Sequence, residues 1–466
     1  MSQPPQKRIA ILGGGIAGLT AAWQLAQLDP TLNVTLFEAS NRLGGTVETV
    51  RRDGFVLECG PDGWVTEKPW ARELAIELGL EDQLIHSNDA TRVTWILIDG
   101  VLTAMPDSMR MMVPTDLAAL DASPLFTETA KQAYAAEPTR ADELRATAPD
   151  HDESIASIVL RHFGPEVLEK VAAPLLTGVF GGDVTTLSVR AVMPAFVAME
   201  REHGSLIAAL QSRTKATPPQ PIFTSLKGGT ATLIDRMTAA IPPHWLRLNT
   251  PISSIKPCEA GWKLSGNRNN TDLFPFDALI LAVPAHVARQ LLAPIDTRMA
   301  DLLQMDQTSA VVAALAFTEP LELPAGFGFL VPEREKSLLM AGTFVDQKFP
   351  HRAPAGSHIL RAFFGGASAA QLSPLTDEAI ASAAQDELTR ILGPLPAPAF
   401  SIVRRWPLSL PQYAVGHLER MGELSTLAES QPNLYLLGNP YRGVGLPDLT
   451  RDARQAARTL QQSALT

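Results

Sequence analysis

Three glycines near the N-terminus, Gly13, Gly15 and Gly18, have the spacing of a turn that binds a dinucleotide. Apolar residues 9–12 predict a buried parallel strand before the turn, and residues 16–28 predict a helix after it. The first glycine permits a tight turn, the second lets the backbone approach a pyrophosphate, and the third lets helix and strand pack closely. The diphosphate would lie at the helix N-terminus. A strand–helix turn without a ligand is the alternative, but this context favours a dinucleotide site.

Glu38 and the residues after it extend the pattern. A second apolar strand, residues 34–37, ends at Glu38, at about the distance expected for an acid that binds ribose hydroxyls. Arg42 and the adjacent glycines within residues 43–46 follow. Adjacent glycines let the backbone approach a phosphate or a flat ring, and a guanidinium can bind phosphate. Taken on their own, these residues are better explained as a surface turn with a solvated arginine.

A second glycine-rich turn, Gly438–Leu446, lies near the C-terminus. A buried strand in residues 433–439 leads into it and a helix follows, as at the first turn. The helix N-terminus could direct its dipole at a negative locus on a flavin, although a purely structural turn is the alternative. We expect this strand and the one before Pro284 to complete the parallel sheet, so that the two turns meet. Alternating apolar residues in 309–364 predict antiparallel strands.

Composition limits the protein class. With 466 residues, 45% hydrophobic and 19% charged, the chain fits a soluble protein of two or three domains. A net charge of -10 argues against general nucleic-acid binding. The polar start, residues 1–7, predicts no signal peptide, and no run of about 18 apolar residues predicts a membrane span. Cys59 and Cys258 form no disulfide framework, and no metal site is expected.

Taken together, the two turns, Glu38 and the residues after Arg42 resemble the FAD flavoproteins of amine-oxidase type. Three further stretches are similar to a narrower group, the protoporphyrinogen oxidases, and the similarity extends over essentially the whole chain. These stretches are residues 174–183 with Leu187 and Ser188, residues 406–413, and residues 438–448.

The resemblance implies roles for single residues. The first turn would hold the FAD diphosphate, Glu38 the ribose, and Ile252 the adenine. Arg92 would bind a substrate carboxylate, although its spacing to Pro106 departs slightly from the family pattern, and Gly178 would line a tetrapyrrole pocket. The cofactor-binding residues implied in this way are Gly13, Gly14, Gly15, Ile16, Ala17, Gly18, Glu38, Ala39, Arg42, Gly45, Thr46, Gly60, Pro61, Asp62, Gly63, Ile252, Trp406, Gly438, Asn439, Val444, Gly445 and Leu446.

The implied fold class is α/β, with a Rossmann-like FAD-binding domain, an antiparallel-sheet substrate domain and a helical insertion like the membrane domain of the family. Residues 212–221 have the composition of a linker. The implied boundaries are 1–88, 222–290 and 396–466 for the three FAD-binding parts, 89–211 for the helical region and 291–395 for the substrate domain.

The implied activity is oxidation of protoporphyrinogen IX to protoporphyrin IX in haem biosynthesis, with FAD as cofactor and dioxygen as electron acceptor. Coproporphyrinogen III is the alternative substrate. Because the flavin carries the redox step, no catalytic acid–base pair is expected. An amine oxidase or carotenoid desaturase of the same superfamily, and a flavin- or porphyrin-binding carrier without turnover, stay open. We expect a cytoplasmic protein; peripheral contact with a membrane and a homodimer stay open.

Overall fold

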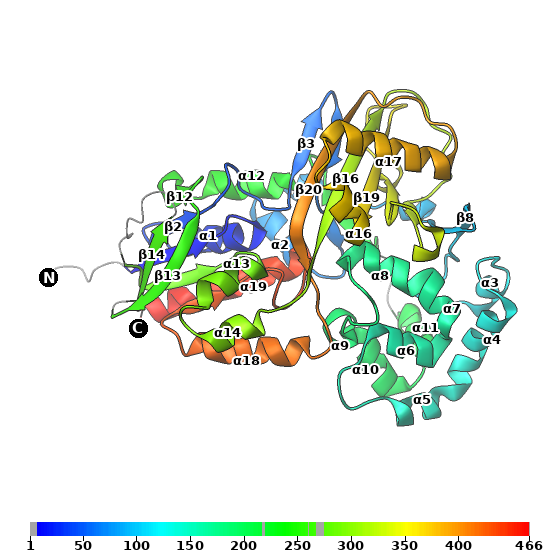
Figure 1. The fold of residues 1–466 in the computed structure, drawn as a ribbon, viewed down its shortest axis with the longest axis horizontal. Helices are drawn as coiled ribbons and strands as arrows, with labels where there is room; N and C mark the ends of the chain where they lie inside the picture. The colour runs from blue at the N-terminus through cyan, green and yellow to red at the C-terminus, as the bar shows by residue number, and fades with distance from the viewer. Residues whose placement is uncertain (1–6, 217–219, 260, 267–274, 466) are drawn as a thin grey trace.

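The molecule combines a parallel β-sheet with helices on both faces, a larger mixed sheet and a cluster of short helices (Figure 1). It is a computed structural model that describes residues 7–216, 220–259, 261–266 and 275–465. The predicted α/β fold class, with its parallel sheet, antiparallel strands and helical region, is confirmed.

Five parallel strands form the sheet that carries both glycine turns. Their order is β12, β2, β1, β15 and β21, so the N-terminal strand lies in the middle. The strands before Pro284 and Gly438 do complete this sheet, because β15 pairs with β1, and β21 with β15. The strands are β1 (Arg8–Leu12), β2 (Asn33–Phe37), β12 (Leu246–Arg247), β15 (Ala278–Leu281) and β21 (Leu434–Leu436).

The side chains of β1 alternate between two apolar cores. Ile9 and Ile11 pack with α1, α2, α12 and α19, whereas Ala10 and Leu12 pack with α13, α14 and α18. A strand that is buried on both faces needs no polar side, which explains its uninterrupted apolar sequence. The helices are α1 (Ile16–Leu28), α2 (Trp70–Glu77), α12 (Ala231–Ala240), α13 (Ala285–Leu292), α14 (Thr297–Leu302), α18 (His417–Glu429) and α19 (Leu446–Leu465).

A seven-stranded sheet lies beside the parallel one, in the order β20, β16, β19, β18, β17, β7 and β8. Only its β17–β7 pair is parallel, so the prediction of antiparallel strands in residues 309–364 is confirmed. Helices α16 (Gly366–Leu372) and α17 (Asp377–Leu392) cover one face. The strands are β20 (Phe400–Pro411), β16 (Gln307–Phe317), β19 (His358–Gly365), β18 (Ala341–Phe344), β17 (Gly328–Leu330), β7 (Thr94–Ile98) and β8 (Val101–Ala104).

Short helices between residues 117 and 216 share an apolar core. Helix α11 continues to Ala216, so the composition-based linker prediction is wrong for residues 212–216, and residues 217–219 of that segment lie outside the described residues. Across the described ranges, no helix is both long and apolar enough to cross a membrane. The helices are α3 (Leu117–Asp121), α4 (Glu128–Ala136), α5 (Ala141–Thr147), α6 (Ile155–Phe163), α7 (Pro165–Val167), α8 (Ala173–Phe180), α9 (Val189–Val192), α10 (Pro194–His203) and α11 (Leu206–Ala216).

Small hairpins and short strands connect these units. The β3–β4 and β13–β14 pairs are antiparallel, as are β9–β10 and the β5–β11–β6 sheet. A one-turn helix, α15 (Val345–Lys348), follows β18. The strands are β3 (Thr49–Arg52), β4 (Phe55–Glu58), β5 (Trp64–Val65), β6 (Leu84–His86), β9 (Met109–Arg110), β10 (Val113–Pro114), β11 (Phe223–Leu226), β13 (Ile252–Cys258) and β14 (Gly261–Gly266).

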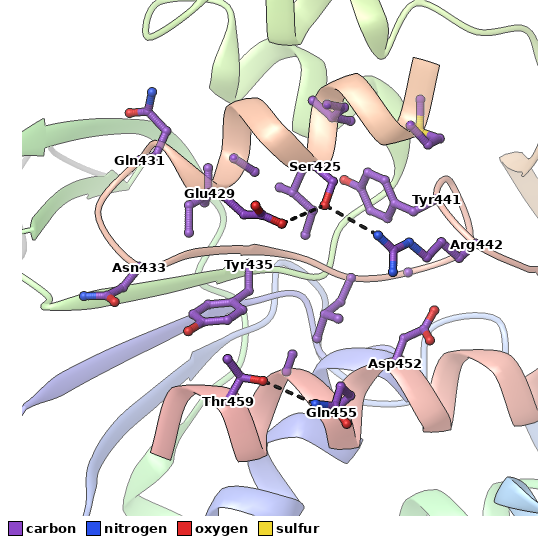
Figure 2. Close-up of a pocket in the computed structure, with 18 residues that line it drawn as sticks. Ser425, Glu429, Gln431, Asn433, Tyr435, Tyr441, Arg442, Asp452, Gln455 and Thr459 are labelled. Atoms are coloured by element: carbon purple, nitrogen blue, oxygen red, sulfur yellow. Dashed lines mark hydrogen bonds between the residues drawn. The ribbon is translucent and has the colours of Figure 1, made fainter. Parts of the chain in front are cut away.

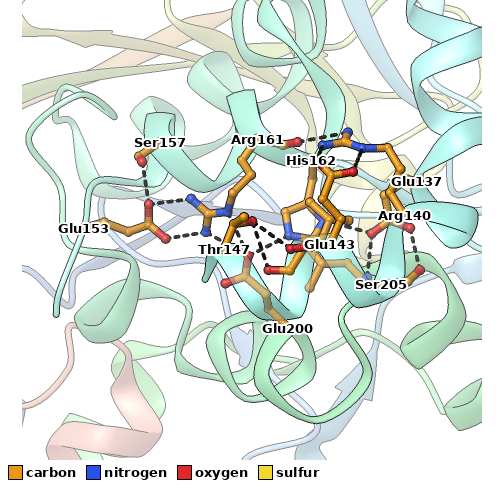
Figure 3. A network of polar contacts seen from close by, with 12 residues as sticks. Glu137, Arg140, Glu143, Thr147, Glu153, Ser157, Arg161, His162, Glu200 and Ser205 are labelled. Carbon is orange, nitrogen blue, oxygen red and sulfur yellow. Dashed lines mark hydrogen bonds and ion pairs between the residues drawn. The ribbon is translucent and has the colours of Figure 1, made fainter. Parts of the chain in front are cut away.

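A buried polar network joins the helices of this cluster (Figure 3). His162 lies between two carboxylates, with Nδ1 2.8 Å from Glu137 Oε1 and Nε2 3.0 Å from Glu200 Oε1. Arg161 bridges Glu200 and Glu153. Burial lowers the pKa of His162, but the hydrogen bonds and charges of Glu137 and Glu200 outweigh it and hold that pKa above its ordinary value. Both ring nitrogens can donate only when the imidazole is charged.

We predict that His162→Gln lowers the free energy of unfolding by about 3–5 kcal/mol near pH 6, because one buried glutamate loses its cationic partner. A raised pKa in the fold contributes stability that is present below the ordinary pKa of histidine and is lost as pH rises through the folded value. The gap between wild type and variant should therefore shrink toward high pH in denaturant titrations. The exposed His151 provides the control, His151→Gln, which should leave the pH profile unchanged; a gap independent of pH would contradict a charged His162.

Candidate functional site

The first glycine turn places three glycines in three different environments. A Cβ on Gly13, which has φ +101°, would lie 2.2 Å from the Ala282 carbonyl oxygen, and a Cβ on Gly18 would lie 2.0 Å from that of Gly13. Gly15 has ordinary extended geometry, and the nearest atom to its Cβ position is the Gly45 Cα at 4.0 Å. Neither strain nor protein packing explains a glycine at 15. It leaves room for a ligand at the N-terminus of α1, as the sequence predicts.

Glu38 ends β2 beside this turn. One carboxylate oxygen accepts the Gly14 N–H at 2.7 Å and the other accepts the Ser40 N–H at 2.7 Å. The backbone N–H of Thr250 donates to the Glu38 carbonyl, which brings Ile252 at the start of β13 to the same side of the sheet. The structure thus places together the residues expected at the ribose and adenine end of a dinucleotide.

The loop after Arg42 lies against the first turn, because the Gly44 N–H donates to the Gly14 carbonyl at 2.8 Å. The Arg42 guanidinium points back into its own loop, toward the Gly45 and Val47 carbonyls, and lies 3.3 Å from Glu48. Arg42 therefore shapes the glycine loop in this structure. Its direct contact with phosphate stays a prediction.

The Gly60–Gly63 loop packs onto the Arg42 loop, since a Cβ on Gly60 would lie 1.8 Å from the Thr46 carbonyl oxygen. The indole N–H of Trp406 donates to the carbonyl of the preceding residue, Cys59, at 2.7 Å. Gly45, Thr46, Gly60 and Trp406, which are far apart in the sequence, therefore lie along one path from the first turn.

Asp62 in this loop is held by two cations from the seven-stranded-sheet side. Lys348 Nζ lies 2.9 Å and Arg361 Nη1 3.5 Å from Asp62 Oδ2. Burial raises the pKa of Asp62, but the charges of Lys348 and Arg361 outweigh it and keep that pKa below its ordinary value. Neither cation is recognisable from the sequence around Asp62, because nearly 300 residues separate each of them from it.

Two aromatic residues, Tyr413 and His417, bind the backbone of the C-terminal turn. The hydroxyl of Tyr413 donates to the Asn439 carbonyl and accepts the Gly443 N–H at 3.0 Å. His417 stacks on Tyr413 with ring centroids 3.9 Å apart, and its Nε2 lies 3.0 Å from the Tyr441 carbonyl. Burial lowers the pKa of His417 to about 4, so the ring is neutral at physiological pH. Tyr413 lies in the 406–413 stretch, whose resemblance was the one sequence signal for it.

Arg92 and Gly178, the predicted substrate residues, belong to neither glycine turn: Arg92 precedes β7 of the seven-stranded sheet, and Gly178 lies in α8 of the helical cluster. A Cβ on Gly178 in α8 would contact the Leu330 side chain at 3.6 Å. Leu330 pairs with Ile96 on β7, the strand that begins just after Arg92. Arg92 Nη2 donates to the Asp107 carbonyl at 3.0 Å. One strand pair therefore links the two residues, although they do not touch one another.

A cavity of about 550 Å³ lies at the outer edge of the parallel sheet, between α18, β21 and α19 (Figure 2). Arg442, Asp452 and Glu429 lie on its rim, and Gly438 and Tyr441 line it from the back of the C-terminal turn. Of the predicted site residues only Gly438 borders it, so this cavity is separate from the path along the glycine loops.

Comparison with known proteins agrees with this geometry. The model of the flavin containing amine oxidoreductase family matches residues 16–461. The chain belongs to this family. It is accordingly a flavin-dependent oxidoreductase, and the open position at Gly15 beside the Gly44–Gly45 loop fits the diphosphate of a flavin dinucleotide.

Two curated relatives and one solved structure are similar to this chain over nearly its whole length. It is 30% identical to the coproporphyrinogen III oxidase of Bacillus subtilis, over 97% of each chain. It is 29% identical to the chloroplastic protoporphyrinogen oxidase of Nicotiana tabacum, over 96% of this chain and 84% of the tobacco protein. A crystal structure from an Exiguobacterium species, provisionally assigned as a protoporphyrinogen oxidase, superposes with a TM-score of 0.86 at 32% identity, over 99% and 100% of the two chains.

We predict opposite outcomes for alanine at Gly15 and at Gly18. Gly15→Ala keeps the fold, because its backbone is unstrained and its Cβ meets nothing closer than 4.0 Å, but it weakens flavin binding by at least about a hundredfold since the methyl enters the diphosphate path. Gly18→Ala destabilises the chain itself, since its Cβ would lie 2.0 Å from a backbone oxygen.

Flavin content by visible absorbance and the melting temperature of the flavin-free protein separate the two effects. Full flavin occupancy in Gly15→Ala would reject the diphosphate site. Unchanged melting of flavin-free Gly18→Ala would contradict the packing role of Gly18.

Proposed function

We propose that the protein is an FAD-dependent porphyrinogen oxidase and that coproporphyrinogen III is its substrate, with protoporphyrinogen IX as the second candidate. Dioxygen is the proposed terminal electron acceptor. The observation that carries the proposal is the continuous path from Glu38 and Gly15 to Trp406, which suits a long dinucleotide. The implied substrate residues, Gly178 and Arg92, are linked by the β17–β7 strand pair.

The choice of FAD rests on the adenosine end of the path. Glu38 still has free lone pairs on both carboxylate oxygens after accepting two backbone N–H groups, so it can bind ribose hydroxyls. Ile252 offers an apolar side chain near it. A mononucleotide flavin would leave this end without a partner, whereas the adenosine of FAD uses it.

The choice of substrate rests on charge, because the Bacillus and tobacco relatives differ in the substrate they are named for and are almost equally similar to this chain. Arg110 is an exposed residue on β9. Partial desolvation and the charge of Arg92 lower its pKa, while the charge of Asp89 acts in the opposite direction. Neither arginine has a carboxylate ion-pair partner among the described residues. Two unpaired guanidinium groups favour the substrate with more propionates, and coproporphyrinogen III carries vinyl-free, propionate-rich edges.

Each part of the chain then has a defined task. A flavin held by these residues would supply a hydride acceptor for a meso carbon of the porphyrinogen, with the matching proton leaving a pyrrole nitrogen. Arg92 and Arg110 bind propionates at one end of the cleft, and Gly178 gives the flat macrocycle room beside Leu330. Trp406, fixed by its bond to Cys59, and the Asp62 cluster hold the Gly60–Gly63 loop in place.

The proposed function is tested by giving the purified FAD-loaded protein each porphyrinogen separately and recording the fluorescence of the porphyrin formed. We expect turnover of both, with kcat/KM higher for coproporphyrinogen III. A higher value for protoporphyrinogen IX would reverse the choice of substrate, and oxidation of neither, with hydrogen peroxide released from simple amines, would place the protein among the amine oxidases.

We predict that Arg92→Gln raises KM for coproporphyrinogen III at least about tenfold and leaves FAD content unchanged, because a charge-assisted hydrogen bond contributes about 1.5–3 kcal/mol. Arg110→Gln should raise it as well. Steady-state kinetics measures the effect, and Arg145→Gln on the exposed surface of α5 is the matched control. Unchanged KM in both cleft variants would remove these arginines from the substrate site.

A further inference from the structure

Gln412 follows the last residue of β20 and joins the helical cluster to the seven-stranded sheet. Its side chain is buried, and its Nε2 lies within hydrogen-bond distance of three acceptors: the Phe180 carbonyl at 2.9 Å, Thr308 Oγ1 at 3.1 Å and the Leu410 carbonyl at 2.9 Å. Its backbone N–H donates to the Asp306 carbonyl at 2.9 Å. Phe180 ends α8, the helix that carries Gly178.

The turn after α8 is shaped to receive this side chain. Gly181 caps the helix with φ +65°, and a Cβ there would lie 2.7 Å from Thr308 Oγ1. A Cβ on Gly182 would lie 1.6 Å from Gln412 Oε1. Both glycines therefore permit the C-terminus of α8 to lie directly on the amide of Gln412 and on β16.

The next residue, Tyr413, binds the C-terminal glycine turn. Its buried hydroxyl binds the Asn439 carbonyl and the Gly443 N–H of the C-terminal turn. Its carbonyl accepts the Ser188 N–H at 2.7 Å, so the main chain here is also anchored to the helical cluster. Two consecutive side chains thus bind two different segments. Gln412 binds the end of α8, and Tyr413 binds the C-terminal turn, which is predicted to lie beside the flavin.

We propose that the Gln412–Tyr413 dipeptide is a spacer that sets the distance between the flavin and the tetrapyrrole wall on α8, with Gln412 as a positioning residue for the substrate. This inference rests on the proposed function. Hydride transfer needs the reacting atoms about 3–3.5 Å apart, and a displacement of about 1 Å can cost about a hundredfold in rate. The backbone of these two residues is short and hydrogen-bonded at both ends, to Asp306 and to Ser188. It therefore fixes the distance between α8 and the C-terminal turn.

The test compares Gln412→Met with wild type in the FAD-loaded protein. Methionine has a similar length and leaves the three acceptors without their donor. We expect anaerobic flavin reduction by coproporphyrinogen III to slow at least about tenfold, while FAD content and the rate at which dioxygen reoxidises dithionite-reduced flavin stay at wild-type values. Amide hydrogen exchange should quicken in residues 174–182 of the variant.

Two further variants make the result specific. Tyr413→Phe should show the crossed pattern, with a changed visible circular dichroism of the flavin and weaker FAD binding, but wild-type exchange in residues 174–182. Gln385→Met also loses one side-chain hydrogen bond to a backbone carbonyl, that of Pro396, and should leave all readouts unchanged.

Wild-type reduction rates in Gln412→Met, or equal loss of FAD in both spacer variants, would overturn the spacer. If wild type oxidises neither porphyrinogen, the proposed function fails by itself. Hydrogen exchange and flavin circular dichroism then still decide whether Gln412 acts on α8 and Tyr413 on the C-terminal turn. If both readouts changed in both variants, separate roles of the two residues would be refuted.

Discussion

The backbone hydrogen bonds at the carboxyl edge of the parallel sheet are the interactions on which the rest of the structure depends. Gly13 donates to the carbonyl of Phe37, Glu38 to that of Arg247, Ala282 to that of Leu12, and Leu437 to that of Leu281. Each bond joins the first residue after one strand to the last residue of the neighbouring strand. The chain therefore leaves all five strands at one level, and glycine turns from distant parts of the sequence meet at a single edge.

Buried ion pairs connect the loops of the parallel-sheet unit to the seven-stranded sheet. Glu58 and Arg352 are both fully buried with their charged atoms 3.2 Å apart, and Asp62 is paired with Lys348 and Arg361. Such pairs contribute little net stability after desolvation, but they tolerate few alternative arrangements. They fix how the loops of the parallel-sheet unit meet the seven-stranded sheet, and thus where one wall of the cleft stands relative to the other.

The sequence predicts best the features that depend on residues close together along the chain. The glycine turns, the apolar strands and Glu38 are recognisable because positive φ, close backbone approach and burial on both faces each restrict residue type within a few positions. Glu137 shows the limit: it lies in a charged, alanine-rich segment that resembles a surface helix, yet it is fully buried. Its partners are distant in the sequence, since His162 lies in α6 and Ser205 directly precedes α11. The inward turn of Arg42 had no local signal either, since a guanidinium near glycines fits phosphate or carbonyl partners equally well.

The strand order also has a consequence for biosynthesis. β1 is made first, yet its neighbour β15 follows about 270 residues later and the edge strand β21 later still. At translation rates of about 5–20 residues per second, β1 pairs early with β2 but waits many seconds for β15, its neighbour on the other side. The helical cluster, whose apolar core comes from residues 96–209 alone, can form in that interval. The two glycine turns can therefore meet only after β21 has been made and has paired with β15.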